Sequence, residues 1–135
     1  MRRLCSSILA SLRSAAYCAD YKFRPGITGS ALASRDGLII KADTDINPDN
    51  LAALAAASLG LAQRMAQEVG QGLLQDAVTR NNGGFVALYS VGDTAVLIIT
   101  GDQELKVGRL HSESRETVGK LEALISNAAF GATAR

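Results

Sequence analysis

The chain has 135 residues, of which 47% are hydrophobic and 20% are charged, and its formal net charge is +1. This length suits one domain with a core of its own, and the hydrophobic fraction excludes an intrinsically disordered chain. A net charge near zero, without any basic run, argues against a nucleic-acid partner.

The first predicted element is an amphipathic helix over residues 3–19, in which Leu4, Ile8 and Leu12 recur at helical spacing. Cys5 and Cys18 would lie about 20 Å apart on it, so we expect two free thiols and no disulfide. Serines and arginines interrupt any signal-type apolar core here, and no apolar run in the chain reaches the roughly 20 residues that cross a bilayer. We therefore expect a cytoplasmic protein without a membrane span.

Two strands are predicted next, over residues 27–34 and 38–42. Asp36-Gly37 separates them and is flanked by apolar runs. This pattern indicates a tight hairpin, because glycine readily takes the positive φ that such a turn requires.

A long helix is predicted between Asn47 and Val69. Asn47 is a good N-cap, Pro48 suits the first helical position, and Gly70 supplies a stop. The larger side chains share one face, which we expect to pack on the core: Leu51, Leu54, Ser58, Leu61, Ala62, Met65 and Val69.

The other side of this helix carries small residues, namely Ala52, Ala53, Ala56, Ala57 and Gly60. A helix that is apolar nearly all round is usually buried all round, and small side chains let two helix backbones approach closely. We therefore expect this side to pack against a second molecule. The alternative is that alanine is simply a good helix former and that this side faces water.

Three more strands are predicted after this helix, over residues 73–80, 85–91 and 94–100. Neither side of the strand over residues 73–80 is uniformly apolar, which is typical of a sheet edge. Residues 95–99 have no polar side at all, and this indicates a central strand that is covered on both faces.

A final helix is predicted beyond Gly101, and the tail over residues 128–135 is expected to fray. The predicted order is therefore α-β-β-α-β-β-β-α, an α/β fold of the α+β kind. We expect a five-stranded, mainly antiparallel sheet with the long helix on one face and the two terminal helices on the other. Residues 1–135 then make one domain, whose core spans residues 25–124.

This order of elements is accompanied by Pro25-Gly26-Ile27-Thr28-Gly29, Ser34-Arg35-Asp36-Gly37-Leu38 and Gly84-Phe85-Val86-Ala87-Leu88-Tyr89. Together they resemble the Roadblock/dynein light chain family, and most closely its bacterial stand-alone members of the type of the gliding-motility regulator MglB. The resemblance implies a homodimer, or a heterodimer with a paralogue, in which middle helices pack together and edge strands pair. It also implies a platform that activates or scaffolds a small Ras-like GTPase.

The dimer contacts expected from the small helix side and the edge strand are Ala52, Ala53, Ala56, Ala57, Leu59, Gly60, Ala77 and Val78. Four arginines are candidates for contacts with the GTPase: Arg35, Arg64, Arg80 and Arg109. Nothing in the sequence selects one of the four, and solvated surface is the default for all.

No catalytic, cofactor-binding or metal-binding pattern is recognisable in the sequence. His111 is the only histidine, which excludes a multi-histidine metal site and leaves a surface or helix-capping role. Gly70-Gln71-Gly72 follows a helix instead of a strand, and no Lys-Ser or Lys-Thr follows Gly84, so we predict neither a dinucleotide fingerprint nor a phosphate loop. The acidic group before the long helix lacks the glycine and the glutamate of a calcium loop.

Our leading hypothesis is thus a dimeric, non-enzymatic module that regulates or scaffolds a small GTPase. The alternative is a small-molecule ligand-sensing module, because the small side chains of Gly29, Ala31 and Ala33 would leave room for a pocket. They equally allow the terminal helices to lie close to the sheet, which is the interpretation that we favour.

Overall fold

The computed structural model describes residues 25–133, so the predicted helix over residues 3–19 and both cysteines lie outside the described residues. The elements follow one another as β1 (Ile27–Ser34), β2 (Ile39–Asp43), α3 (Pro48–Glu68), β3 (Asp76–Asn81), β4 (Gly84–Val91), β5 (Ala95–Gly101) and α4 (Val107–Thr133). None of the helices within this part of the chain is long and apolar enough to span a membrane.

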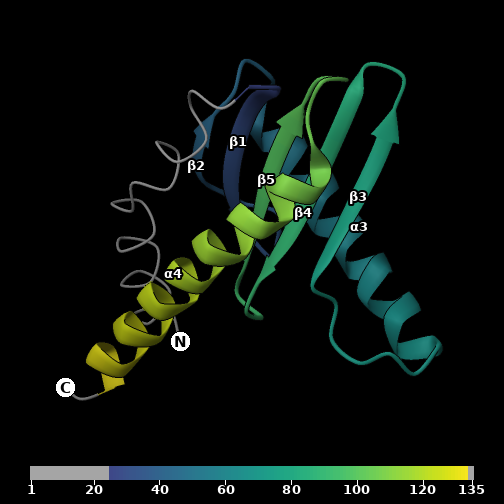
Figure 1. Ribbon diagram of the computed structural model, residues 1–135. Coiled ribbons are helices and arrows are strands. Elements are labelled where there is room, and N and C mark those ends of the chain that lie inside the picture. Colours follow the sequence, from purple (N-terminus) through teal and green to yellow (C-terminus); the bar gives the residue numbers. More distant parts are fainter. Residues whose placement is uncertain (1–24, 134–135) are drawn as a thin grey trace.

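The strands form one five-stranded antiparallel sheet in the order β2-β1-β5-β4-β3 (Figure 1). β5 lies in the middle and all of its residues are buried, which confirms the prediction of a central strand. β2 and β3 form the two edges of the sheet, and the prediction of an edge strand at β3 is therefore also confirmed.

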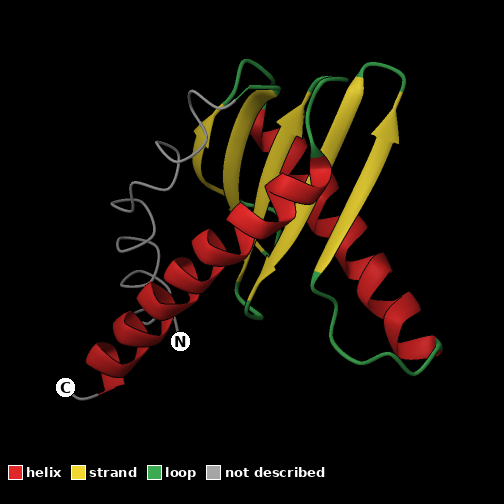
Figure 2. Cartoon of the chain, in the orientation of Figure 1, coloured by secondary structure: helices red, strands yellow, loops and turns green. Residues whose placement is uncertain are grey.

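Helices cover the two faces of the sheet, with α3 on one face and α4 on the other (Figure 2). Alternate residues of a strand point to opposite faces, so neighbouring residues of β5 belong to different cores. Ile98 packs in the cluster that contains Leu59 of α3, whereas Leu97 packs in the cluster that contains Leu121 of α4. The predicted arrangement, with the middle helix alone on one face, is confirmed for the described helices.

The predicted ends of α3 are confirmed by its caps. The Asn47 side chain accepts hydrogen bonds from the backbone N–H groups of Asp49 at 3.0 Å and Asn50 at 3.3 Å, which satisfies two donors that a helix start leaves free. At the other end Gly70 takes a φ of 73° and donates its N–H to the Gln67 carbonyl. Glycine adopts this conformation without strain, and the helix stops there.

The side of α3 that packs on the sheet differs from the predicted one. Its buried residues are Ala52, Ala55 and Leu59. Four large residues of the predicted core face are instead exposed to solvent: Leu54 by 67%, Leu61 by 64%, Met65 by 66% and Val69 by 65%. The expectation that these four side chains face the core was wrong.

The reason is that β1 presents small residues to α3. Ala31 and Ala33 of β1 are completely buried on this face, and a Cβ atom on Gly37 would lie 3.1 Å from Cα of Ala53. A flat surface of small side chains lets the helix backbone approach closely, and larger residues would hold it away. The alanines of β1 therefore accommodate α3, and the interpretation that they make room for the terminal helices is wrong.

This packing changes which residues of α3 are open to a partner. Ala52 and Leu59 have 0% exposure, so neither has surface to offer in the predicted dimer contact. Gly60 is exposed, and a Cβ atom there would meet nothing within 4 Å among the described residues, so no contact within the single chain requires a glycine here. Ala53 and Ala57 are exposed beside the large residues.

Two boundaries differ from the predicted ones by more than one residue. β3 begins at Asp76 and not at residue 73, because the Leu74 N–H is bonded to the Gln63 side chain of α3. Bonding to β4 begins only with the Gln75 carbonyl, which accepts from Ser90. α4 continues to Thr133, so the tail that was expected to fray from residue 128 is helical up to that residue.

Gly84 at the start of β4 is the glycine whose replacement should destabilise the fold most. Its φ is 150°, and a Cβ atom would lie 2.0 Å from the Gly101 carbonyl oxygen. Strained backbone and overpacking together predict a loss of about 3 kcal/mol or more in the free energy of unfolding for Gly84→Ala, measured by urea denaturation. Gly83→Ala is the matched control, because nothing lies within 4 Å of its Cβ position. Equal midpoints for the two variants would contradict this account.

Candidate functional site

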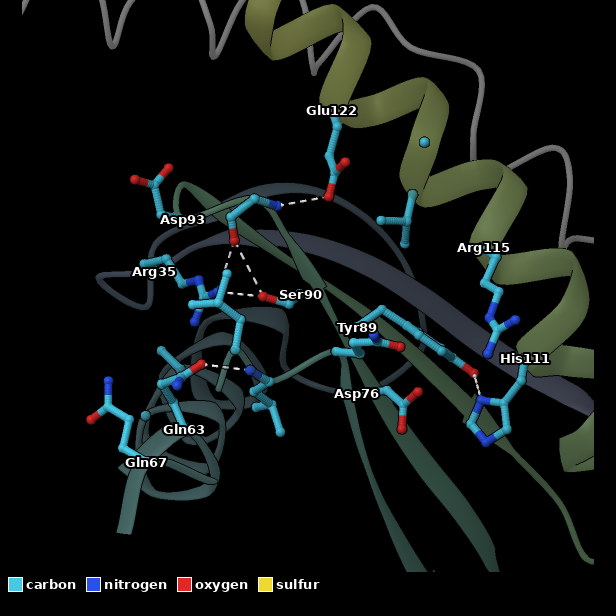
Figure 3. A pocket seen from close by; sticks show the side chains of 18 residues that line it. Arg35, Gln63, Gln67, Asp76, Tyr89, Ser90, Asp93, His111, Arg115 and Glu122 are labelled. Atoms are coloured by element: carbon cyan, nitrogen blue, oxygen red, sulfur yellow. Dashed lines mark hydrogen bonds between the residues drawn. The ribbon is translucent and has the colours of Figure 1, made fainter. Parts of the chain in front are cut away.

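A groove with a volume of about 1030 Å³ lies at the end of the sheet where β4 turns into β5 and where β3 begins (Figure 3). Its walls come from α3, from residues 73–76, from the β4–β5 turn and from α4, and Arg35 reaches it from the β1–β2 turn. Elements that are distant in sequence therefore meet at one place.

Arg35 fixes the β1–β2 turn to the β4–β5 turn. One terminal nitrogen of its guanidinium donates hydrogen bonds to the Ser90 hydroxyl and, at 2.9 Å, to the Gly92 carbonyl. Its Nε atom is buried without a hydrogen-bond partner in the described part of the chain. Burial lowers the pKa of Arg35, and the nearby Asp93 carboxylate opposes this shift. The main role of Arg35 is thus to hold the two turns together, and it is not a freely solvated surface cation.

Tyr89 and His111 form the contact between β4 and α4 in the groove. The Tyr89 hydroxyl and His111 Nδ1 are 2.8 Å apart, and the two rings meet edge to face with centroids 5.6 Å apart. Tyr89 is buried and His111 is half-buried. The predicted surface or capping role of His111 was therefore wrong, because its ring is held against the sheet. Its sequence neighbours gave no indication of a tyrosine partner on a strand.

Two further side chains fix the rim of the groove. Glu122 of α4 accepts a hydrogen bond at 3.2 Å from the backbone N–H of Gly92 in the β4–β5 turn. Gln63 of α3 donates to the Gly72 carbonyl at 3.2 Å and accepts from the Leu74 N–H at 2.8 Å. We call this pair of bonds the Gln63 clamp, and it fixes the loop that leads into β3.

α3 carries an exposed row of large apolar side chains, which we call the α3 stripe: Leu54, Leu61 and Met65. Seven and four residues separate them, so they share one face of the helix. Gly60, Gln63 and Gln67 line the groove from a different side of the helix. The α3 stripe is therefore a second surface, separate from the groove.

The two edges of the sheet differ in how open they are. β2 has five residues, includes Lys41, and pairs with β1 across an irregularity between Leu32 and Ala33. β3 pairs with β4 in regular register over all six of its residues, and most of them are exposed. Short length, lysine and bulges are the features that protect an edge from strand addition, so β3 is the open edge.

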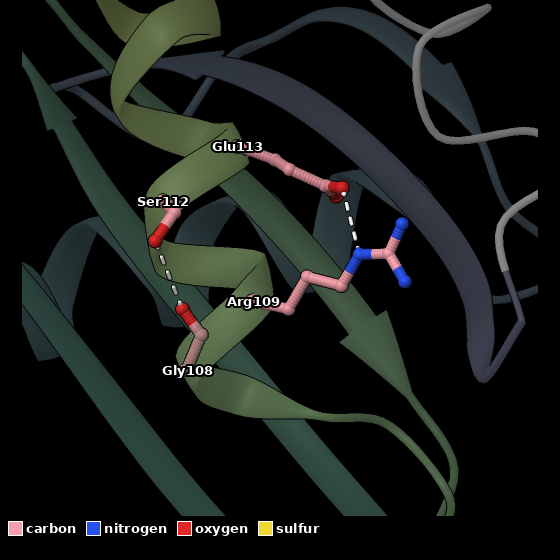
Figure 4. A network of polar contacts seen from close by, with 4 residues as sticks. All are labelled: Gly108, Arg109, Ser112 and Glu113. Atoms are coloured by element: carbon pink, nitrogen blue, oxygen red, sulfur yellow. Dashed lines mark hydrogen bonds and ion pairs between the residues drawn. The ribbon is translucent and has the colours of Figure 1, made fainter.

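The four arginines predicted to contact a GTPase are not brought together. Arg35 lies in the groove, Arg64 is exposed on α3, and Arg80 is exposed on β3. Arg109 lies in the first turn of α4 and pairs with Glu113 at 3.2 Å, beside a bond from Ser112 to the Gly108 carbonyl (Figure 4). Arg115, which the sequence did not single out, lines the groove as well.

Acidic residues before α3 and elsewhere do not gather into a metal site in the part of the chain that is described. Among residues 25–133, no three His, Cys, Asp or Glu side chains are grouped so that they could hold a metal ion. Asp43, Asp45 and Asp49 are exposed, and Asp49 lies in the first turn of α3, where a carboxylate interacts favourably with the helix dipole.

A family model described as the Roadblock/LC7 domain matches residues 17–100. The chain belongs to the Roadblock/LC7 domain family. A curated relative of this Roadblock/LC7 protein is the uncharacterized protein MJ0310 of Methanocaldococcus jannaschii. It is 26% identical over 101 residues, which cover 73% of this chain and 88% of the relative.

Solved structures of other Roadblock/LC7 proteins share this fold. The Roadblock/LC7 domain from Streptomyces avermitilis superposes with a TM-score of 0.73 at 20% identity, over 78% of this chain and 91% of that chain. Myxococcus xanthus MglB superposes with a TM-score of 0.71 at 16% identity, over 91% of this chain and 90% of that chain. The predicted family and fold class are thus confirmed.

Proposed function

We propose that this Roadblock/LC7 protein is a dimeric, non-enzymatic module that regulates or scaffolds a small Ras-like GTPase in the cytoplasm. The observation that carries the proposal is the α3 stripe beside the open edge at β3. A row of large apolar side chains on a helix is seldom left in water, and an open edge is a template for another strand. Both features call for a protein partner.

The proposed dimer uses these two surfaces together. α3 passes behind β4 and β3, and its C-terminal half extends past the sheet at the β3 side (Figure 1). A two-fold axis beside β3 therefore brings two copies of α3 together on the same face of a joined sheet. In this arrangement the α3 stripe and the exposed Ala53 and Ala57 supply the helix contact, and Ala77 and Val78 lie in the strand contact.

The GTPase part of the proposal rests on family membership and predicts state-selective binding. We expect the dimer to bind a Ras-like partner more tightly when it is loaded with a slowly hydrolysed GTP analogue than with GDP. A regulator shifts the conformational equilibrium of its partner's switch segments only if it binds the two nucleotide states with different affinities. The size of the shift is set by the difference in binding free energy. Calorimetric titration measures both affinities, and the first candidates to titrate are any Ras-like proteins that neighbouring genes encode.

The same titration tests how the GTPase is regulated. Alanine at Arg64 is expected to lower the affinity modestly, because its side chain is exposed. An inserted catalytic arginine would instead be revealed by a loss of several orders of magnitude in GTP turnover with intact binding. Equal affinities for the two nucleotide states would leave scaffolding as the function.

A second candidate function is ligand sensing, and the groove is the observation that favours it. Its size suits a small molecule, and its lining combines apolar surface with the half-buried side chain of Arg35. The pocket that the missing side chain of Gly29 was expected to leave is absent. The space is filled by Thr44 and Thr100, whose hydroxyl oxygens would lie 2.9 Å from a Cβ atom at this position. Failure of the GTPase to bind in either nucleotide state would favour this second function.

A further inference from the structure

The free side of β3 can be assigned residue by residue from its pairing with β4. Ser90 donates its N–H to the Gln75 carbonyl at 3.0 Å, and the register continues regularly from Asp76 opposite Tyr89. In an antiparallel pair, hydrogen-bonded positions alternate along the strand. Odd-numbered residues of β3 therefore bond to β4, and the backbone groups of Asp76, Val78 and Arg80 point out from the edge.

These three residues form a pattern that is complementary to itself. Their side chains share one face of the sheet, because residues two apart in a strand lie on the same side. An acid, an apolar residue and a base follow one another at equal spacing. When such a strand pairs antiparallel with a copy of itself about the central residue, each acid lies opposite the base of the other copy.

We propose that two copies of this chain pair through β3 with Val78 on the two-fold axis, so that Asp76 of each copy forms an ion pair with Arg80 of the other. This inference rests on the proposed dimer and adds its register and its preferred partner, a second copy of the same chain. Neither side chain forms a salt bridge with another residue in the described part of the chain, and both are exposed. Both charges are thus available for the contact.

Other registers of the same edge are less favourable. An axis at Asp76 or Arg80 places like charges directly opposite each other, which destabilises a strand pair. An axis at Ala77 or Thr79 places both charges opposite residues without the complementary charge. The axis at Val78 is the register that gives two opposite-charge pairs and also uses the full length from Asp76 to Arg80.

Charge reversal tests the register. A chain with Asp76→Arg has two cations on its edge, and a chain with Arg80→Asp has two anions. We expect each variant alone to dimerise about tenfold to a hundredfold more weakly than the unaltered protein, because two attractive pairs become two repulsive ones. An equimolar mixture of the two variants should form the heterodimer at close to the original affinity, and the double variant Asp76→Arg/Arg80→Asp should again form a homodimer.

Sedimentation equilibrium measures these dissociation constants, and Asp45→Arg in the exposed loop before α3 is the matched control, which should dimerise normally. The weakening of the single variants should shrink in 1 M salt, where the screening length is about 3 Å. Normal homodimers of both single variants, or a mixture that does not recover affinity, would overturn the register and leave the dimer standing. A monomeric unaltered protein would instead remove the proposed dimer and this inference with it.

Discussion

Leu61→Glu is expected to convert the dimer into a folded monomer at micromolar concentration. Leu61 lies in the middle of the α3 stripe and is 64% exposed in the single chain, so the substitution costs little in the fold of one copy. In the dimer it would place a charge without a partner between two apolar helix faces, which is among the costliest changes at an interface. Light scattering with size-exclusion chromatography measures the effect, and we expect the dissociation constant to rise more than about a hundredfold.

Gln67→Glu is the control for Leu61→Glu, because it adds the same charge to the exposed half of α3 away from the stripe. This variant should remain dimeric. If both variants stay dimeric with unchanged thermal stability, then α3 does not form the interface. A monomer in the unaltered protein at the same concentration would disprove self-association altogether.

Val78→Pro is expected to abolish dimerisation while the chain still folds. Proline has no N–H to donate, and the N–H of Val78 points out from the edge, so the loss falls on pairing with the second copy. Ala77→Pro removes an N–H that points toward β4 instead, and its expected effect is a loss of about 3 kcal/mol in the free energy of unfolding. The two substitutions are adjacent in sequence, but Val78→Pro should lower the dimer affinity and Ala77→Pro should lower the free energy of unfolding.

Urea denaturation and light scattering on both variants make this comparison. The expected result is a near-normal unfolding midpoint and a monomer for Val78→Pro, and a clearly lowered midpoint for Ala77→Pro. The reverse assignment would show that even-numbered residues of β3 bond to β4. Dimers from both variants, each with a normal midpoint, would place the interface on another element.

The sequence predicted the strands and the ends of α3 well because those features depend on local chemistry. Asn47 and Gly70 act through hydrogen bonds and φ angles within a few residues, and the apolar run in β5 needs no knowledge of its neighbours. The order of hairpins then leaves few possible sheets.

The face on which α3 packs could not be predicted in the same way. A helical stripe of leucines indicates the core only if the opposing surface has room for large side chains, and this depends on β1. Ala31 and Ala33 keep the side chains of β1 small there. α3 therefore packs with two alanines and Leu59 inward, and it leaves Leu54 and Leu61 exposed. The buried face of α3 follows only when the side chains of β1 and α3 are considered together, as two surfaces that must fit each other.

The groove was missed because its contacts join residues far apart in the chain. Arg35 and Ser90 are 55 positions apart, and Tyr89 and His111 are 22 apart. No local pattern connects such residues, and each one taken alone has an ordinary surface or core role. The sheet register places the β1–β2 and β4–β5 turns at one end and so brings Arg35 to Ser90, whereas the packing of α4 on β4 brings His111 to Tyr89.

The Gln63 clamp has a consequence for the thermodynamics of association. The loop before β3 contains Gly70 and Gly72, and glycine-rich backbone loses much conformational freedom when a partner orders it. Because Gln63 already bonds to Gly72 and Leu74 within a single copy, that freedom is lost during folding and not during binding. The edge strand is thereby preorganised, and little further conformational entropy is lost when a second copy binds to it.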